Sequence, residues 1–209
     1  CLAGLALHFE CSPTELDEEQ LLDYLLYVKN GHRTPSESFY KHTVYGLRYA
    51  FKLCNKKALH LKLPSIARPK KLPVVLNQSE VKQLLKAPAL LKHRLVIALL
   101  YGCGLRCSEV RNIELKDIDL ERKSLFVRAG KGRKDRVVAL ADLHIKGIKK
   151  YQQAERPQKW LFTGNASSGE LVPLSKHGVQ WIVRQANRKC RIHKDVTTHT
   201  LRHTYATHL

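Results

Sequence analysis

The sequence LFVRAGKGRKDRVVAL, residues 125–140, contains two short β-prone runs separated by a turn with two glycines. Two such runs around a glycine-bearing turn are typical of a β-hairpin. The turn carries four Lys or Arg side chains, so the predicted hairpin has a strongly basic tip. Because helical periodicity dominates the rest of the chain, we predict a mainly α fold with a small antiparallel β-hairpin, of the α+β class.

Helical patterns lie on both sides of this hairpin. Before it, residues 90–101 are apolar almost all round, which predicts a buried central helix, and Asn77-Gln78-Ser79-Glu80 has the form of a helix N-cap. After it, a basic helix containing Ile182 runs toward Arg191. Thr198 is predicted to cap the last helix of the sequence.

The first third of the chain predicts a separate helical domain. Ser12-Pro13-Thr14-Glu15 has the form of a capping box and predicts a helix that ends at Asn30-Gly31, and Thr34-Pro35 begins a second helix. Residues 63–73, LPSIARPKKLP, hold three prolines in eleven positions, as in an extended basic linker. We therefore predict a helical domain over 1–62, a linker over 63–75 and a second domain over 76–209.

The composition favours a polyanionic partner. The 209 residues include 37 Lys and Arg against 18 Asp and Glu, a formal net charge of +19. Hydrophobic residues at 44% with charged residues at 26% are ordinary for a globular protein. No apolar run approaches the roughly 20 residues of a membrane span, and no secretory signal is evident, so we expect no membrane association.

The charge is unevenly distributed along the chain. Residues 1–28 contain six acidic residues and no Lys or Arg, whereas residues 38–79 contain nine Lys or Arg and no acid. A stretch of one charge gains free energy by lying along a negative partner, although a solvated helix face is the alternative. The predicted DNA-binding residues are Lys41, Arg48, Lys52, Lys56, Lys57, Lys62, Arg68, Lys70 and Lys71, together with Arg133 and Lys134 at the hairpin tip.

Metal and disulfide chemistry find little support in the sequence. The six cysteines form no CxxC pair, so we predict that they are reduced and mostly pack in the core. His199 and His203 form an HxxxH pair, but Thr200 stands where a zinc protease motif has Glu, and no third ligand is evident. We predict neither a metal nor a cofactor.

Three short patterns could carry chemistry, each with a plain alternative. His199 and Arg202 lie three residues apart near a helix N-terminus, where imidazole, guanidinium and free N–H groups can address one anion; the alternative is a surface pair. Arg106 precedes another helix and Glu109 can hold its side chain, or the two form an ordinary ion pair. Lys131 at the hairpin tip can reach a partner, or is a solvated loop lysine.

Taken together, the three patterns resemble one family. The chain contains, in order, GLRxSE at 104–109, GKGxKxR at 130–136 and HTLRHTYATHL at 199–209, the last preceded by Thr198. The order and spacing of these motifs resemble those of the tyrosine recombinase (phage integrase) family. The Xer and integron-integrase branches look most similar. The resemblance implies an incomplete catalytic domain over 76–209 and, before the linker, a helical core-binding domain of SAM-like fold.

The resemblance also implies roles for particular residues. Arg106 and Arg202 would hold the non-bridging oxygens of the scissile phosphate, and Lys131 would protonate the leaving 5′ oxygen. His199 would assist proton transfer, and Glu109 would support Arg106. Fixed cations can stabilise the charge of in-line attack without a metal. A tyrosine nucleophile would store the bond energy as a 3′-phosphotyrosyl link, which allows breaking and rejoining of DNA without ATP.

One part of the family pattern is missing. In the family a further His or Trp and then the nucleophilic Tyr follow the HxxR pattern, whereas Tyr205 lies at a position that the family uses for packing. We therefore expect a chain truncated before its nucleophile and short of a first helix. Alone, it should bind duplex DNA without cleaving it.

The biological setting follows only from the resemblance. Four protomers would act on two recombination sites, and this chain alone would be monomeric, in a bacterial cytoplasm near the nucleoid. Two alternatives stay open: a catalytically silent DNA-binding truncation product or regulator, and DNA relaxation like that of type IB topoisomerases. RNA binding is a weaker third, since aromatic residues make up only 7% of the chain.

Overall fold

The computed structural model describes residues 2–30, 37–55, 63–64, 72–128, 135–165 and 170–209. The chain forms two compact units, Cys1–Lys70 and Lys71–Leu209. The division lies within the stretch 63–75 that the sequence predicts as a linker. Leu63 is buried in the core of the first unit, and Leu76 is buried in the core of the second.

The first unit is helical. Within its described residues, the helices are α1 (Leu2–Phe9), α2 (Glu18–Asn30) and α3 (Glu37–Leu53). Their apolar faces meet in one core that includes Leu5, Leu25, Leu47 and Phe51. Cys54 follows α3 and is exposed, so it does not pack in a core as most of the cysteines are predicted to do.

The predicted start of the helix that ends at Asn30, now α2, is wrong. Residues 12–15 form a turn in which the Glu15 N–H donates to the Ser12 carbonyl at 2.9 Å. The reciprocal bonds of a capping box are made by Asp17 and Gln20 instead: the Gln20 N–H donates to the Asp17 carboxylate at 2.8 Å, and the Asp17 N–H to the Gln20 side-chain oxygen at 3.1 Å. Two candidate caps stand five residues apart, and the one adjacent to the helix is used.

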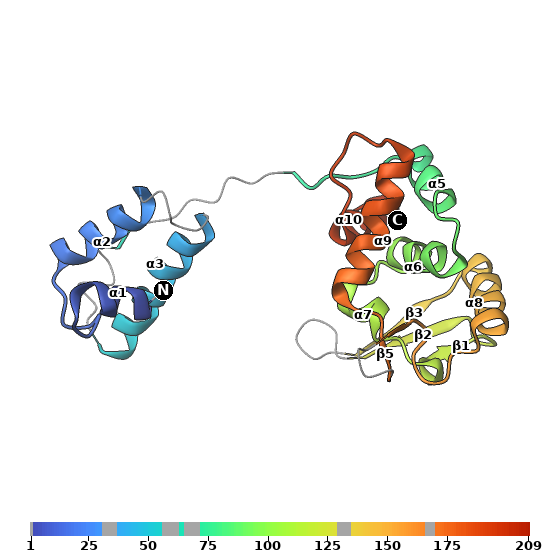
Figure 1. Cartoon of the computed structure of the whole chain (residues 1–209), viewed down its shortest axis with the longest axis horizontal. Coiled ribbons are helices and arrows are strands. Elements are labelled where there is room, and N and C mark those ends of the chain that lie inside the picture. Colours follow the sequence, from blue (N-terminus) through green and yellow to red (C-terminus); the bar gives the residue numbers. More distant parts are fainter. Residues whose placement is uncertain (1, 31–36, 56–62, 65–71, 129–134, 166–169) are drawn as a thin grey trace. The chain divides into compact units, whose positions relative to one another are not determined.

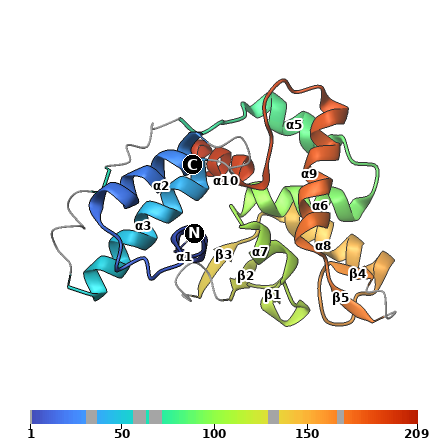
Figure 2. The same ribbon diagram turned by 60° about the vertical axis from the view of Figure 1, so that its left-hand side comes forward.

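In the second unit, helix α6 occupies the centre. The helices are α5 (Gln78–Lys86), α6 (Leu91–Gly102), α7 (Cys107–Arg111), α8 (Asp142–Glu155), α9 (Lys176–Cys190) and α10 (Thr198–His208), with a short 3-10 helix, η1 (Leu115–Asp117). Helix α6 packs against α5, α8, α9 and α10 (Figures 1 and 2). Its buried Leu95, Ile97 and Leu99 confirm the predicted central helix. Asn77 and Glu80 form the predicted capping box of α5.

The predicted β-hairpin is confirmed. Strands β1 (Ile118–Asp119), β2 (Ser124–Val127) and β3 (Arg136–Ala139) form an antiparallel sheet in the order β1-β2-β3, with Val127 opposite Arg136. The hairpin tip, which holds Lys131, lies outside the described residues. A second sheet pairs β4 (Thr163–Asn165) with β5 (Leu171–Pro173), which the sequence did not suggest. The fold is therefore mainly α with small antiparallel sheets, as predicted.

Helix α10 begins one residue earlier than expected. The Thr200 N–H donates to the Thr197 hydroxyl at 3.2 Å, so Thr197 is the cap, while Thr198 is buried in the first turn. Both threonines could cap the helix, and burial of Thr198 decides between them. Among the described residues, no helix is long and apolar enough to cross a membrane.

The cysteines that the structure describes are free thiols. Cys103 and Cys107 are buried in the second core, as predicted, and burial raises the pKa of the Cys103 thiol to about 11. Cys11 and Cys190 are half-buried.

Candidate active site

The site begins where α6 ends. Gly104 has a positive φ of 55°, which only glycine adopts without strain, and it turns the chain toward α7. Arg106, the residue before α7, donates its backbone N–H to Glu109 Oε2 at 2.8 Å and its side-chain Nη1 to Oε1 at 2.7 Å. The predicted pair of Arg106 and Glu109 is therefore formed.

A third residue, which the sequence did not single out, completes this pair. Arg136, the first residue of β3, donates Nη1 to Glu109 Oε1 at 2.8 Å and Nη2 to Oε2 at 2.7 Å. This bidentate geometry is the strongest that an arginine and a carboxylate can form. The Glu109 side chain is only 3% exposed, so the carboxylate lies beneath the arginines.

Helix α10 brings Arg202 to the same carboxylate. Its Nη1 lies 3.8 Å from Glu109 Oε2 and donates a hydrogen bond to the Gly104 carbonyl. Three guanidinium groups and one carboxylate give the cluster a net charge of 3 − 1 = +2. Each of the three arginine side chains is about one-third exposed, at 29% for Arg106 and 32% for Arg136 and Arg202. The cluster can therefore receive an anion from solvent.

Electrostatics keep the buried carboxylate ionised. Burial by itself raises the pKa of Glu109, but hydrogen bonds from Arg136 and from the backbone and side chain of Arg106 outweigh it and lower that pKa to about 2. Burial and the nearby Arg106 charge lower the pKa of Arg202, and the hydrogen bond to Glu109 raises the pKa of Arg136.

The depressed pKa of Glu109 predicts acid sensitivity. Stability that depends on the ionised carboxylate is complete above its ordinary pKa of 4.5 and is lost as the pH falls from about 5 to 2. Complete protonation of Glu109 should lower the free energy of unfolding by on the order of 3 kcal/mol. We expect urea unfolding between pH 7 and 3 to show a smaller pH dependence for Glu109→Gln than for the unchanged chain. Parallel pH profiles would contradict this assignment.

Two further residues, His199 and Lys131, are predicted to be catalytic. His199 lies exposed in the first turn of α10, three residues before Arg202. Lys131 lies outside the described residues. The Tyr205 ring packs against Gly104, because a Cβ added there would come within 2.3 Å of Tyr205 Cδ1. Among the described residues, no group of three His, Cys, Asp or Glu side chains could hold a metal ion.

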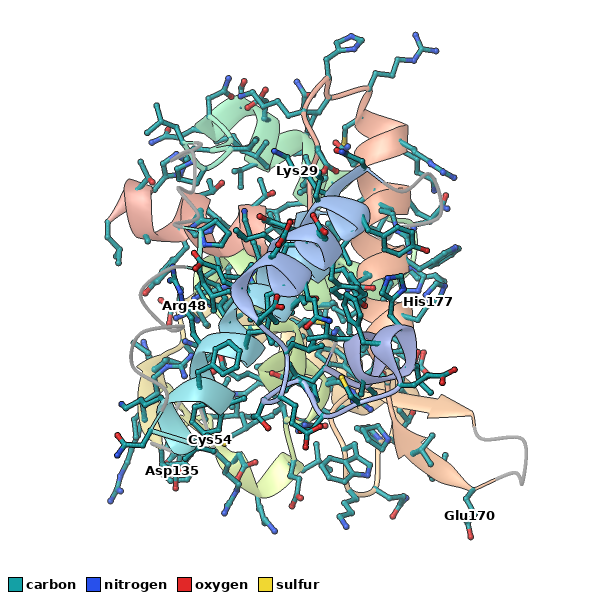
Figure 3. All side chains as sticks on the ribbon, turned by 90° about the vertical axis from the view of Figure 1, so that its left-hand side faces the viewer. Lys29, Arg48, Cys54, Asp135, Glu170 and His177 are labelled. Atoms are coloured by element: carbon teal, nitrogen blue, oxygen red, sulfur yellow. The ribbon has the colours of Figure 1, made fainter. Side chains whose placement is uncertain are left out.

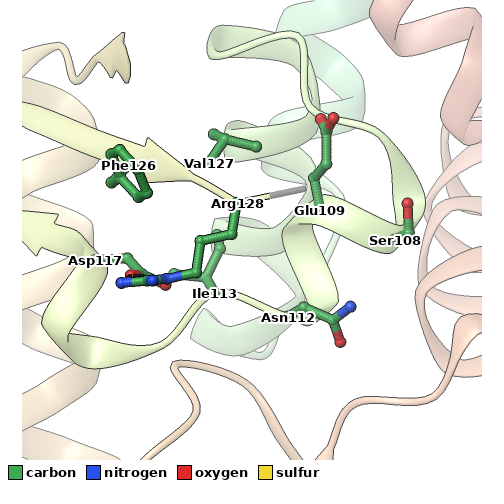
Figure 4. A pocket seen from close by; sticks show the side chains of 8 residues that line it. All are labelled: Ser108, Glu109, Asn112, Ile113, Asp117, Phe126, Val127 and Arg128. Atoms are coloured by element: carbon green, nitrogen blue, oxygen red, sulfur yellow. Dashed lines mark hydrogen bonds and ion pairs between the residues drawn. The ribbon is translucent and has the colours of Figure 1, made fainter. Parts of the chain in front are cut away.

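Beside the cluster, a small pocket contains a second ion pair. Glu109, Asp117 and Arg128 are among its lining residues (Figure 4). Arg128, which follows β2, lies with Nε 2.7 Å and Nη2 2.6 Å from Asp117 Oδ1, and its guanidinium lies over the Phe126 ring at 5.2 Å. The hairpin is thus bound to buried carboxylates at the end of β2 and at the start of β3.

The predicted DNA-binding residues are only partly described. Lys41, Arg48 and Lys52 lie on α3, and Lys52 is exposed. Arg48, labelled in Figure 3, donates to the carbonyls of Leu63 at 3.1 Å and Pro64 at 3.0 Å, so it also ties the end of the first unit to α3. The remaining candidates lie outside the described residues: Lys56, Lys57, Lys62, Arg68, Lys70, Lys71, Arg133 and Lys134.

One exposed helix face was missed by the sequence analysis. His177, Trp181, Arg184 and Arg188 are exposed on α9 at spacings of four, three and four residues, which places them along one side of the helix. Helix α9 packs against α7, which Arg106 precedes, and against α10, which carries Arg202 in its second turn. The helical spacing of these residues was the available signal.

Comparisons with known proteins agree with this geometry. The model of the phage integrase family matches residues 74–209. The chain is 33% identical over 208 residues to an integrase/recombinase of Sinorhizobium fredii, covering 98% of this chain and 66% of the relative. It is 34% identical over 200 residues to the tyrosine recombinase XerA of Thermococcus kodakarensis, covering 93% of this chain and 68% of that protein.

Solved structures share the fold. A crystal structure of XerA recombinase superposes with a TM-score of 0.59 at 25% identity, over 99% of this chain and 73% of the other. A lambda integrase dimer bound to a core site superposes with a TM-score of 0.68 at 17% identity, over 92% of this chain and 72% of the other. The chain belongs to the phage integrase family of tyrosine recombinases. It spans about two thirds of the length of the relatives named above.

Proposed function

We propose that this chain is the DNA-binding and phosphate-activating part of a site-specific recombinase that breaks and rejoins DNA through a 3′-phosphotyrosyl intermediate. The observation that carries the proposal is the cluster of Arg106, Arg136 and Arg202 around the buried, ionised Glu109. Its net positive charge and partial exposure suit one phosphate group of a duplex.

The proposed chemistry places charge where the reaction creates it. In-line attack on a phosphodiester builds negative charge on the non-bridging oxygens, and preorganised cations stabilise that charge. Arg106 and Arg202 come from different elements and both approach Glu109, so they can address two oxygens of one phosphate. His199 would assist proton transfer, and Lys131 would protonate the leaving 5′ oxygen.

We propose that the nucleophile is a tyrosine of the full-length protein outside this chain. Tyr205 is the nearest tyrosine in sequence to Arg202, but its half-buried ring packs against the Gly104 backbone. An attacking hydroxyl needs in-line access to phosphorus, which a packing position does not favour.

The proposed DNA interface combines two surfaces. On the second unit, the exposed face of α9 offers Trp181, Arg184 and Arg188. On the first unit, Lys41 and Lys52 lie on α3, and Lys52 is exposed. Several of the solved structures with this fold are complexes, among them the Tn1549 transposon integrase with circular intermediate DNA, XerH with its difH substrate and lambda integrase with a core site. Assembly of four protomers on two such sites remains part of this proposal.

Binding should depend steeply on salt. Each phosphate that is neutralised releases counterions, so we expect a plot of log affinity against log salt with a slope of roughly −4 or steeper, as for four or more phosphate contacts. Fluorescence anisotropy with a labelled duplex measures this slope. Arg184→Gln should make the slope shallower by about one, whereas Lys123→Gln, which removes a lysine paired with Asp142, should not. A slope near zero would contradict the proposed interface.

Covalent trapping tests the proposed reaction. Duplexes selected by binding to this chain are given a nick beside the presumed cleavage site, so that the cleaved end diffuses away and the protein–DNA link accumulates. The full-length protein should become linked to a 3′ phosphate through tyrosine. Specific binding without a link would favour the silent DNA-binding alternative, and relaxation of supercoils without strand exchange would favour the topoisomerase alternative.

A further inference from the structure

The Arg136 side chain holds the site carboxylate more completely than the side chain of either proposed phosphate-binding arginine. It donates to both Glu109 oxygens, at 2.8 and 2.7 Å. The Arg106 side chain donates to one oxygen at 2.7 Å, and the nearest Arg202 nitrogen stays 3.8 Å away. Arg136 is therefore the main side-chain partner of this carboxylate.

The burial of Glu109 makes this partner necessary. A carboxylate that is 3% exposed must be paired and hydrogen-bonded to stay ionised. Among the groups that lower its pKa, the Arg136 side chain has the largest effect. Without it, the charge on Glu109 would rest on Arg106 and on the distant Arg202.

We propose that Arg136 is a positioning residue that acts through Glu109, fixing the carboxylate so that it can orient Arg106 and Arg202 toward a single anion. The part of this inference that makes the anion a scissile phosphate rests on the proposed function. Because Arg136 opens β3 and pairs with Val127 of β2, the hairpin and the starts of α7 and α10 share one carboxylate.

A competing explanation is that Arg136 contacts the anion directly as a third cation, since its side chain is 32% exposed. If Arg136 is a positioning residue, its effect on anion binding requires Glu109. If it contacts the anion directly, its effect does not require Glu109. Arg136→Lys separates them, because lysine keeps the positive charge but cannot form the planar bidentate pair.

The first test is a double-mutant cycle with sulfate, a tetrahedral dianion, bound to the chain as it stands. NMR titration should show that Arg136→Lys weakens sulfate binding about fivefold when Glu109 is present. In the Glu109→Gln background the same substitution should change the affinity by less than about twofold. Equal weakening in both backgrounds would overturn the inference in favour of direct contact.

The second test measures the carboxylate itself by carbon-13 NMR. The Glu109 titration midpoint should rise by at least about one pH unit in Arg136→Lys, and the Arg106 guanidinium signals should shift or broaden. Arg128→Lys is the matched control, because Arg128 binds the buried Asp117 on the same hairpin and not Glu109. It should leave the Glu109 midpoint and the sulfate affinity unchanged, while thermal unfolding checks that each variant folds.

The two tests also separate this inference from the proposed function. Sulfate that fails to bind the unchanged chain would count against the phosphate site and thus the proposed function, whereas the Glu109 midpoint and the Arg106 signals still decide whether Arg136 positions the cluster. If neither changes in Arg136→Lys, the inference is wrong.

Discussion

Arg202→Ala should reduce strand cleavage about 1000-fold or more in a protein that carries the proposed tyrosine nucleophile. Arg202 approaches the buried Glu109 from α10, and its guanidinium is one of the cations proposed to stabilise charge on the non-bridging oxygens. Removal of such a group costs far more in the transition state than in the ground state. DNA affinity should fall by only about threefold, because one phosphate contact among several is lost. Single-turnover cleavage and anisotropy measure the two quantities.

A matched control separates loss of catalysis from loss of charge. Arg122 is 87% exposed and forms a 3.8 Å ion pair with Asp119, away from the cluster. Arg122→Ala removes the same charge and should leave both cleavage and binding nearly unchanged. If Arg202→Ala instead weakened binding and cleavage to the same degree, Arg202 would hold DNA generally and not the transition state.

Gly104→Ala should destabilise the second unit strongly. Gly104 has a φ of 55°, and a Cβ there would lie 2.3 Å from Tyr205 Cδ1 and 2.7 Å from Cε1. Backbone strain and overpacking together cost about 2–4 kcal/mol. We expect the unfolding midpoint to fall by roughly 5–15 °C in calorimetry. Cleavage should also fall, because the Gly104 carbonyl accepts the hydrogen bond from Arg202.

Gly164→Ala is the control for this prediction. A Cβ at Gly164 would come no closer than 3.5 Å to its nearest neighbour, Leu174 Cα, which is ordinary contact. Gly164→Ala should lower the free energy of unfolding by less than about 1 kcal/mol. Equal unfolding midpoints for Gly104→Ala and Gly164→Ala would mean that the Tyr205 ring moves away freely. The close packing at Gly104 would then contribute nothing to stability.

Helices and strands that are indicated by residues close together in the sequence could be predicted. The apolar run 90–101 and the Asn77–Glu80 cap gave the right helices, and the β-prone runs around the glycine turn gave the hairpin. Where two residues could make the same local bond, the folded chain uses one of them: Ser12 instead belongs to a separate turn and Asp17 caps α2, whereas Thr198 is buried and Thr197 caps α10. Those contacts arise only in the folded chain.

The site was predictable in part for the same reason. Arg106 and Glu109 are three residues apart, so their ion pair follows from helix geometry. Arg136 lies 27 positions beyond Glu109, and its bidentate bond depends on how β3 packs against α7. In the sequence it is the last residue of the GKGxKxR pattern, and nothing in that pattern indicates that its partner is Glu109.

The most direct measurement is a crystal structure of this chain bound to a selected duplex. The central claim is that one phosphate of the duplex lies against Arg106 and Arg202. We predict each guanidinium within hydrogen-bonding distance of a non-bridging oxygen of that phosphate, with Glu109 still held by Arg136. A duplex bound only through α3 or α9, with no phosphate at the cluster, would contradict the account.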